Sequence, residues 1–285
     1  MIVMEAAQET VPAALAREVS VLSSLAHCGW LNTQQLQALC FHGFAISTVR
    51  TTLRYFEEAG WVHHVRWRVG SPDGGHIWAI LPKGVRVLER YLPVTPQLMQ
   101  DLSRPSSALE QEEWRVQLAV RSFVTRFVLE ARHQPLLATA SVTLPTNTRR
   151  SELDCPRIEP DVSLFIEWER QTTQSSNWLP WTSPPSACGR PTQYALYCDR
   201  TVALSYLPWL IRTWTASVTT EPRIIVLLLN SEDRQVAARN VLNELDSKAS
   251  LRVAIWADLE HGIFQGNWRN GLDQPTAFQA LDDQT

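Results

Sequence analysis

The order of hydrophobic periodicities in the first third of the chain is the feature that most restricts its fold. Apolar residues recur at helical spacing in three successive segments, 12–30, 31–41 and 46–60. Two shorter alternating segments follow at 61–70 and 76–82, and SPDGG between them supplies turn residues. A further short helix is expected from Pro82, because proline is favoured in a first helical turn. Three helices followed by a hairpin is the order of a winged helix-turn-helix.

The ends of these helices carry their own signals. Asn32 or Thr33 is expected to cap the second helix, and Ser47 the third, because their side-chain oxygens accept hydrogen bonds from backbone N–H groups in the first turn. Gly60 is expected to end the third helix, at a position where glycine is favoured. Val49, Leu53 and Phe56 would then form its core stripe.

The second half of the chain has an α/β pattern. After a helix at 113–133, strand-like runs follow at 136–145, 159–168, 193–199, 223–230 and 251–258, with helical stretches at 201–216 and 231–247. This alternation predicts a mixed or parallel central sheet, so the fold class is α+β overall. The expected boundaries are a winged helix at 12–95, a linker at 96–112, an α/β domain at 113–270 and a flexible tail at 271–285. A long Ser-, Pro- and Trp-rich insertion at 170–192 separates two of the strands.

Charge is distributed unevenly along the chain. The net charge is −3, but seven Lys/Arg against four Asp/Glu between Phe44 and Tyr91 give that segment +3, which leaves −6 for the rest. Basic residues gather on the third helix and the hairpin, the two elements with which a winged helix contacts DNA. The expected DNA-binding residues are Ser47, Arg50, Thr51, Arg54, His64, Arg66, Arg68 and Lys83.

No segment has the composition of a membrane anchor or a signal peptide. The longest apolar run, at 224–229, is far shorter than the roughly 20 residues needed to cross a bilayer. Five cysteines, at 28, 40, 155, 188 and 198, include no C-x-x-C pair, which favours thiols in a reducing cytoplasm. A metal site formed by the last three is the alternative, although their spacing matches no common zinc module.

Several segments together resemble the replication-relaxation family of bacterial plasmid and mobile-element proteins. The resemblance covers roughly 15–270, and its segments include REVSVLSSLAHCGWLNTQQL, STVRTTLRYFEEAGWVHHV, HIWAILPKGVRVL, EPDVSLFI and LRVAIWADLEHGIFQGNWR. It implies an N-terminal winged helix that binds DNA. It also implies a C-terminal domain similar to restriction endonucleases, and a role in plasmid replication.

The stretch IEPDVSLFIEWER, 158–170, decides whether such a domain could cut DNA. Endonucleases of this type place an Asp at the start of one strand, and an acid and a Lys on the next, around Mg²⁺. Asp161 matches the first acid, and the second strand offers Tyr197 and Asp199 where the family has Glu and Asp. A second register uses Glu167 instead. Lys83 and Lys248 are the chain's only lysines, so neither register contains the lysine, and arginine cannot exchange protons in its place.

The sequence therefore predicts a cytoplasmic, DNA-binding protein of a plasmid or mobile element that controls replication or transcription. Its second domain is expected to be an inactive nuclease fold, with Asp161, Glu167 and Asp199 as vestigial acids, and no catalytic residue, metal or cofactor is assigned. The expected partners are double-stranded DNA, a second copy of the chain and a replication or mobile-element protein, with no membrane. The alternatives are a metal-dependent nuclease that uses Asp161 with Glu167 or Asp199, and a protein–protein interaction module.

Overall fold

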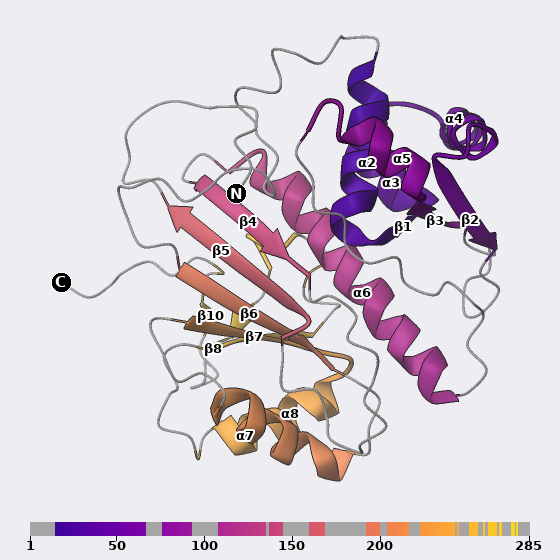
Figure 1. The fold of residues 1–285 in the computed structure, drawn as a ribbon. Helices are drawn as coiled ribbons and strands as arrows, with labels where there is room; N and C mark the ends of the chain where they lie inside the picture. The colour runs from indigo at the N-terminus through magenta and orange to yellow at the C-terminus, as the bar shows by residue number, and fades with distance from the viewer. Residues whose placement is uncertain are drawn as a thin grey trace. The chain divides into compact units, whose positions relative to one another are not determined.

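The fold was analysed in a computed structural model of the 285-residue chain. The structure describes residues 15–66, 76–92, 108–134, 137–144, 160–168, 192–199, 204–216, 223–242 and 251–255, together with residue 244 and short pieces between 259 and 278. The chain divides into two compact units, of which the first extends to Trp114 and the second begins at Arg115. Most elements of both units are labelled in Figure 1.

The first unit consists of helices around a small antiparallel sheet. Its elements are α2 (Ala16–Cys28), β1 (Trp30–Asn32), α3 (Thr33–Cys40), α4 (Ile46–Glu58), β2 (Val62–Arg66), β3 (His76–Ile80) and α5 (Pro82–Leu88). The sheet order is β1-β3-β2. The three predicted helices and the hairpin are thus confirmed. Strand β1 was missed, because Trp30–Asn32 gain their strand character only from pairing with Ile77–Ala79.

The core of the first unit follows the predicted stripes. Val49, Leu53 and Phe56 of α4 are at most 1% exposed. Gly60 ends α4 with φ +74°: its N–H donates to Glu57 O at 2.8 Å, and the N–H of Trp61 donates to Phe56 O at 2.9 Å. The rings of Trp61 and Phe56 also contact each other, with centroids 5.4 Å apart. This is a complete Schellman motif, so the prediction for Gly60 is confirmed.

The two predicted helix N-caps differ in outcome. The Asn32 side chain accepts from Gln35 N at 2.8 Å, and the Gln35 side chain accepts from Asn32 N at 2.9 Å, which completes a capping box. The cap predicted at Ser47 is wrong. Helix α4 begins at Ile46, and its N-cap is Ala45, two residues before Ser47, in extended backbone and with no side-chain cap.

The second unit is built on a seven-stranded mixed sheet in the order β10-β9-β8-β7-β6-β5-β4. Its elements are α6 (Ala108–Ala131, which begins within the first unit), β4 (Leu137–Thr143), β5 (Val162–Trp168), β6 (Thr192–Cys198), the 3₁₀ turn η2 (Leu204–Tyr206), α7 (Leu207–Ala216), β7 (Arg223–Leu229), α8 (Glu232–Leu242), β8 (Leu251–Ile255), β9 (Trp268–Arg269) and β10 (Pro275–Thr276). Strands β4, β5 and β6 are antiparallel, whereas β6, β7 and β8 are parallel. The predicted mixed sheet is confirmed.

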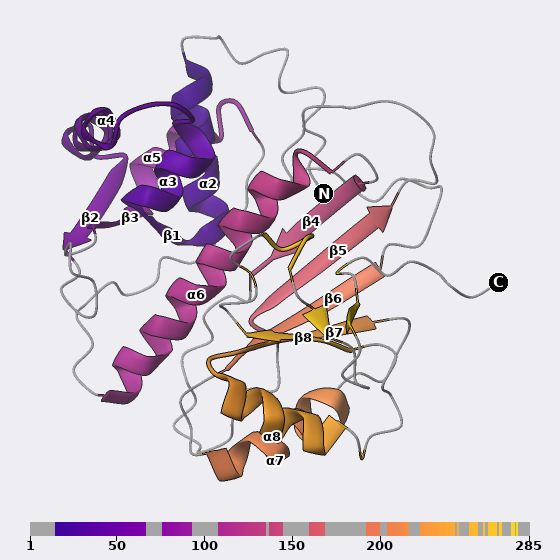
Figure 2. The same cartoon turned by 180° about the vertical axis from the view of Figure 1, so that it is seen from behind.

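Helices cover both faces of this sheet (Figures 1 and 2). Alternate residues of β6 and β7, such as Tyr197 and Leu227, pack with α7 and α8. Tyr194 points to the other face, where its ring stacks on Phe278 at 4.9 Å, and Phe278 also contacts Phe127 of α6. Phe278 is fully buried and Pro275–Thr276 pair with β9, so the flexible tail predicted from 271 is wrong at these residues. The insertion at 170–191 lies outside the described residues.

No helix among the described residues combines the length and the apolar composition needed to cross a bilayer. In the same part of the chain, Cys28, Cys40 and Cys198 form no disulfide. Cys28 and Cys198 are buried, and Cys40 is half-buried beside Ser24. Because Cys155 and Cys188 lie outside the described residues, the alternative cysteine metal site stays a hypothesis.

Candidate nucleic-acid interface

Helix α4 turns a polar, cationic face to solvent. Ser47, Arg50, Thr51 and Arg54 are all exposed, directly opposite the buried stripe of the same helix. The Thr51 hydroxyl donates to Ser47 O at 3.0 Å. Within the described residues, neither Arg50 nor Arg54 forms a hydrogen bond or an ion pair with another side chain, so both guanidiniums are available to a ligand.

The hairpin β2–β3 presents its own row of basic and aromatic side chains. Arg66 lies directly opposite His76, and His64 directly opposite Trp78. Because cross-strand partners share a face of the sheet, these four side chains lie on one side of the hairpin. The rings of His64, His76 and Trp78 lie against one another, with tilted pairs whose centroids are 5.4 Å apart for His64 and His76 and 4.9 Å apart for His64 and Trp78. Arg66 is exposed at the end of the row.

This face of the hairpin points towards α4. The His64 ring nitrogen Nδ1 lies 2.6 Å from Glu57 Oε1 of the helix, with both side chains about one third exposed. The contact links the two basic rows. His64, one of the residues predicted to bind DNA, therefore also links β2 to α4.

The positive charges of helix and hairpin converge on His76. The pKa of His76 lies below its ordinary value of 6.5, first because burial disfavours its charged form, and then because His64, Arg50, Arg66 and Arg54 repel a proton there. Three guanidiniums from two elements thus lie within electrostatic reach of one imidazole. His76 was not among the predicted residues, because its only signal in the sequence is its place at the start of the second alternating segment.

Two other predicted residues have different outcomes. Lys83 does not join this cluster: its Nζ donates to Ala59 O at 2.7 Å, so the side chain satisfies a carbonyl at the C-terminal end of α4. Its role in DNA binding stays a prediction. Arg68 lies outside the described residues.

In the second unit, Asp161 and Asp199 lie at one edge of the sheet, at neighbouring strand ends. Asp161 precedes β5 and is 2% exposed, and its Oδ2 accepts from Cys198 N at 2.9 Å. Asp199 follows β6, which runs antiparallel to β5. An Asp at the start of a strand, beside the end of the next strand, is the arrangement that the sequence predicted.

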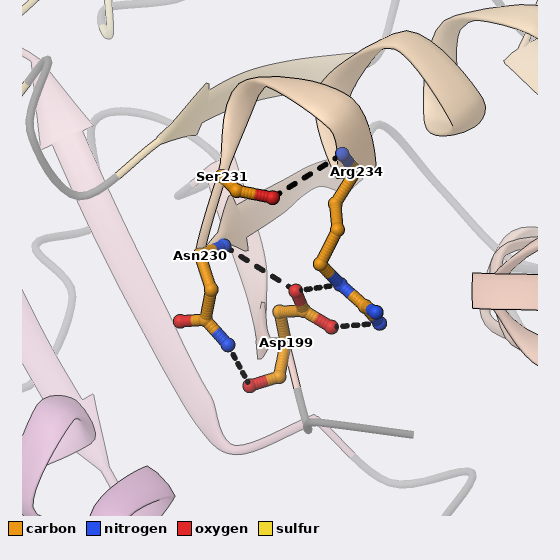
Figure 3. Close-up of polar contacts among 4 residues, drawn as sticks. All are labelled: Asp199, Asn230, Ser231 and Arg234. Atoms are coloured by element: carbon orange, nitrogen blue, oxygen red, sulfur yellow. Dashed lines mark hydrogen bonds and ion pairs between the residues drawn. The ribbon is translucent and has the colours of Figure 1, made fainter. Parts of the chain in front are cut away.

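Asp199 is held by an arginine instead of being open to a metal ion (Figure 3). Its carboxylate is fully buried and forms a bidentate ion pair with Arg234 of α8, through Nε and, at 2.6 Å, through Nη2. Asn230 N donates to the same carboxylate at 3.3 Å, and the Ser231 hydroxyl accepts from Arg234 N at 3.4 Å. The pair therefore joins the end of β6 to the first turn of α8.

The register that pairs Asp161 with Glu167 is excluded by strand geometry. The two residues stand at opposite ends of β5, six positions apart, which corresponds to about 20 Å at roughly 3.3 Å per residue. One metal ion cannot bind both. Within the described residues, no group of three or more His, Cys, Asp or Glu side chains is placed to hold a metal ion.

The model of the replication-relaxation family matches residues 22–180, which is more than half of the chain. The chain belongs to the replication-relaxation family. The resemblance drawn from the sequence motifs is thereby confirmed. No curated protein and no solved structure matches the chain.

The matched region of this replication-relaxation protein includes α4, the hairpin and β5. It ends before β6, so Tyr197 and Asp199 lie beyond it. Tyr197, which stands where the sequence resemblance would place a Glu, is 2% exposed and packs in the core shared with α7 and α8. A buried tyrosine at that position supplies no carboxylate to a metal ion.

Proposed function

We propose that this protein binds duplex DNA in a replication-related role, through a winged helix-turn-helix formed by its first unit. The observation that carries the proposal is the convergence of Arg50, Arg54 and Arg66 from helix and hairpin, with no protein partner among the described residues. Membership of the replication-relaxation family supports the replication-related role. The order of α2, α3, α4 and the β2–β3 hairpin fits the winged-helix fold.

In this proposal α4 is the recognition helix. Arginine binds phosphate or the edge of guanine through two parallel N–H groups, and hydroxyls such as those of Ser47 and Thr51 bond to bases or to phosphates. The hairpin is the wing, and Arg66 at its exposed end contacts the backbone. The net charge of −3 does not oppose this, because the segment that contains both elements carries +3.

Fluorescence anisotropy with random duplex DNA at several salt concentrations tests the proposal. We expect salt-dependent binding by the full chain, weakened in the double variant Arg50→Ala/Arg54→Ala. If both arginines contact phosphate, the slope of log K against log salt should become shallower by about 1.8, because each phosphate contact contributes roughly 0.9.

The matched control is Arg86→Ala/Arg90→Ala, which removes the same charge from exposed positions on and just after α5. It should bind nearly as well as the parent chain. Equal losses in both double variants would show that net charge, and not α4, drives binding. Binding that is absent, or indifferent to salt, would contradict the proposal and favour a protein partner for the first unit.

We further propose that the second unit is a nuclease-like fold that serves as a scaffold without catalysis, for dimerisation or for recruiting a replication protein. The succession α6, β4, β5, β6, α7, β7 fits an endonuclease-like core. Two features oppose catalysis: Asp199 is neutralised by Arg234, and the chain has no lysine between Lys83 and Lys248. Incubation with supercoiled and linear DNA in Mg²⁺ or Mn²⁺ should give no cleavage above that of an Asp161→Asn variant. Metal-dependent cleavage that this substitution abolishes would overturn the scaffold role.

A further inference from the structure

The hairpin face that points towards α4 contains a histidine, His76, that lies among cations. Within the described residues, His76 pairs with no acid. His76 is half-buried, opposite Arg66 and in tilted ring contact with His64, with centroids 5.4 Å apart. Glu57 of α4 contacts this face through a bond to His64 at 2.6 Å. Within the described residues, no acid pairs with Arg50, Arg54 or Arg66. An anion is the ligand that such a site selects.

We propose that Arg50, Arg54, Arg66 and His76 form a single site for one DNA backbone phosphate, and that His76 takes up a proton when the phosphate binds. The inference rests on the proposed function and adds a named ligand group and a pH dependence. His76 donates an N–H to the phosphate only in its protonated form, whereas the three arginines stay charged throughout.

The charges around His76 explain why the proton arrives with the ligand. On β2 it faces His64 and Arg66, and on α4 it faces Arg50, Arg54 and Glu57. On the other side, Thr33 at the start of α3 contributes only a hydroxyl, bonded to His76 O at 3.4 Å. Burial and the repulsion of these cations lower the pKa of His76 in the unbound protein. A phosphate within hydrogen-bond distance reverses the local charge, raises that pKa and so couples proton uptake to binding.

The sign of the pH effect follows from this coupling. The complex holds more protons than the unbound protein in the pH range around and below the ordinary histidine value of 6.5. Affinity for DNA therefore rises as pH falls. One linked proton limits the change to tenfold per pH unit, and we expect a roughly three- to tenfold tightening between pH 8 and pH 6 at constant ionic strength.

The experiment is anisotropy with random duplex DNA from pH 5.5 to 8.5, using the full chain, His76→Gln and the control His63→Gln. His63 is exposed on the opposite face of β2, so its substitution should leave the pH dependence intact. In His76→Gln the tightening between pH 8 and pH 6 should disappear. Thermal unfolding of each variant establishes that it is folded.

A measurement on the unsubstituted chain covers the case in which His76→Gln does not fold. Histidine ring resonances titrated by NMR, with and without duplex DNA, should show the pKa of His76 rising on binding. The inference is overturned if DNA affinity does not change with pH, or if His76→Gln retains the full effect, while the proposed function stands in both cases. Absence of binding at every pH would overturn the proposed function, and this inference with it.

Discussion

Substitution of Asp199 separates a structural acid from a metal ligand. Its carboxylate is fully buried and bonded to Arg234, whose side chain is 11% exposed. Removing one member of a buried pair leaves the other charge without compensation, at a cost of about 3–5 kcal/mol in unfolding free energy. For a domain of this size each kcal/mol lowers Tm by roughly 2–4 °C, so Asp199→Asn should lower Tm by about 6–20 °C.

The assay is thermal unfolding of the full chain followed by circular dichroism, in EDTA and in Mg²⁺. Arg234→Met should destabilise the protein to a similar extent, because it leaves Asp199 as a buried anion without a partner. The double variant Asp199→Asn/Arg234→Met should lose less than the sum of the two single losses, since the pair acts as a unit.

Glu244→Gln is the matched control. Glu244 pairs with Arg212 on the surface, where both side chains are more than half exposed, and exposed pairs contribute at most about 1 kcal/mol. If Asp199→Asn unfolded at the same temperature as the parent chain, or at a higher one, the structural role would be refuted. Stabilisation by Mg²⁺ that disappears in Asp199→Asn would instead identify a metal ligand.

Three further outcomes are expected. Gly84→Ala should lower the free energy of unfolding in urea by about 1–3 kcal/mol, because the new Cβ would lie 2.3 Å from Trp61 O. Gly43→Ala, at φ +79° with nothing within 4 Å of the new Cβ, should lower it only by the roughly 1–2 kcal/mol of a strained backbone. Burial lowers the pKa of His27 below its ordinary value of 6.5. Below that pH the unfolded chain binds a proton that the folded chain does not, so the unfolding free energy should fall as the pH drops from 7 to 5. The fall should be less steep in His27→Gln. Asn32→Ala should lower unfolding free energy by about 1 kcal/mol in the same assay, whereas Ser47→Ala, without a cap bond to lose, should not.

Local patterns predicted the elements of both units well. The α4 stripe, the Gly60 stop and the five main strands of the second unit all follow from periodicity and cap chemistry in contiguous sequence. Strand β1 and the buried Phe278 could not be predicted in this way. Strand β1 depends on its pairing with Ile77–Ala79, and the Phe278 ring depends on its contact with Tyr194. Both partners lie far away in the sequence, where local patterns do not reach.

The candidate sites show the same division. The exposed cations of α4 could be predicted from the helical period, because the buried stripe fixes the opposite face. The pairing of Arg66 with His76 depends on the hairpin register, which the sequence does not specify through the intervening nine residues. The partner of Asp199 is likewise 35 positions away, so the sequence predicted a vestigial acid without the arginine that holds it.

The use of arginine differs between the two units, and this difference is what makes an acidic chain compatible with DNA binding. In the second unit, Arg234 pairs with Asp199, and Arg121 bonds to Gln117 within α6. Both guanidiniums therefore have partners within the protein. In the first unit, Arg50, Arg54 and Arg66 are exposed, and the nearby Glu57 is bound to a histidine instead of to them. Net charge counts every arginine alike, whereas a phosphate responds only to those that the protein leaves unpaired within about a Debye length. The face of α4 and the hairpin is therefore where an anionic ligand of this chain should first be sought.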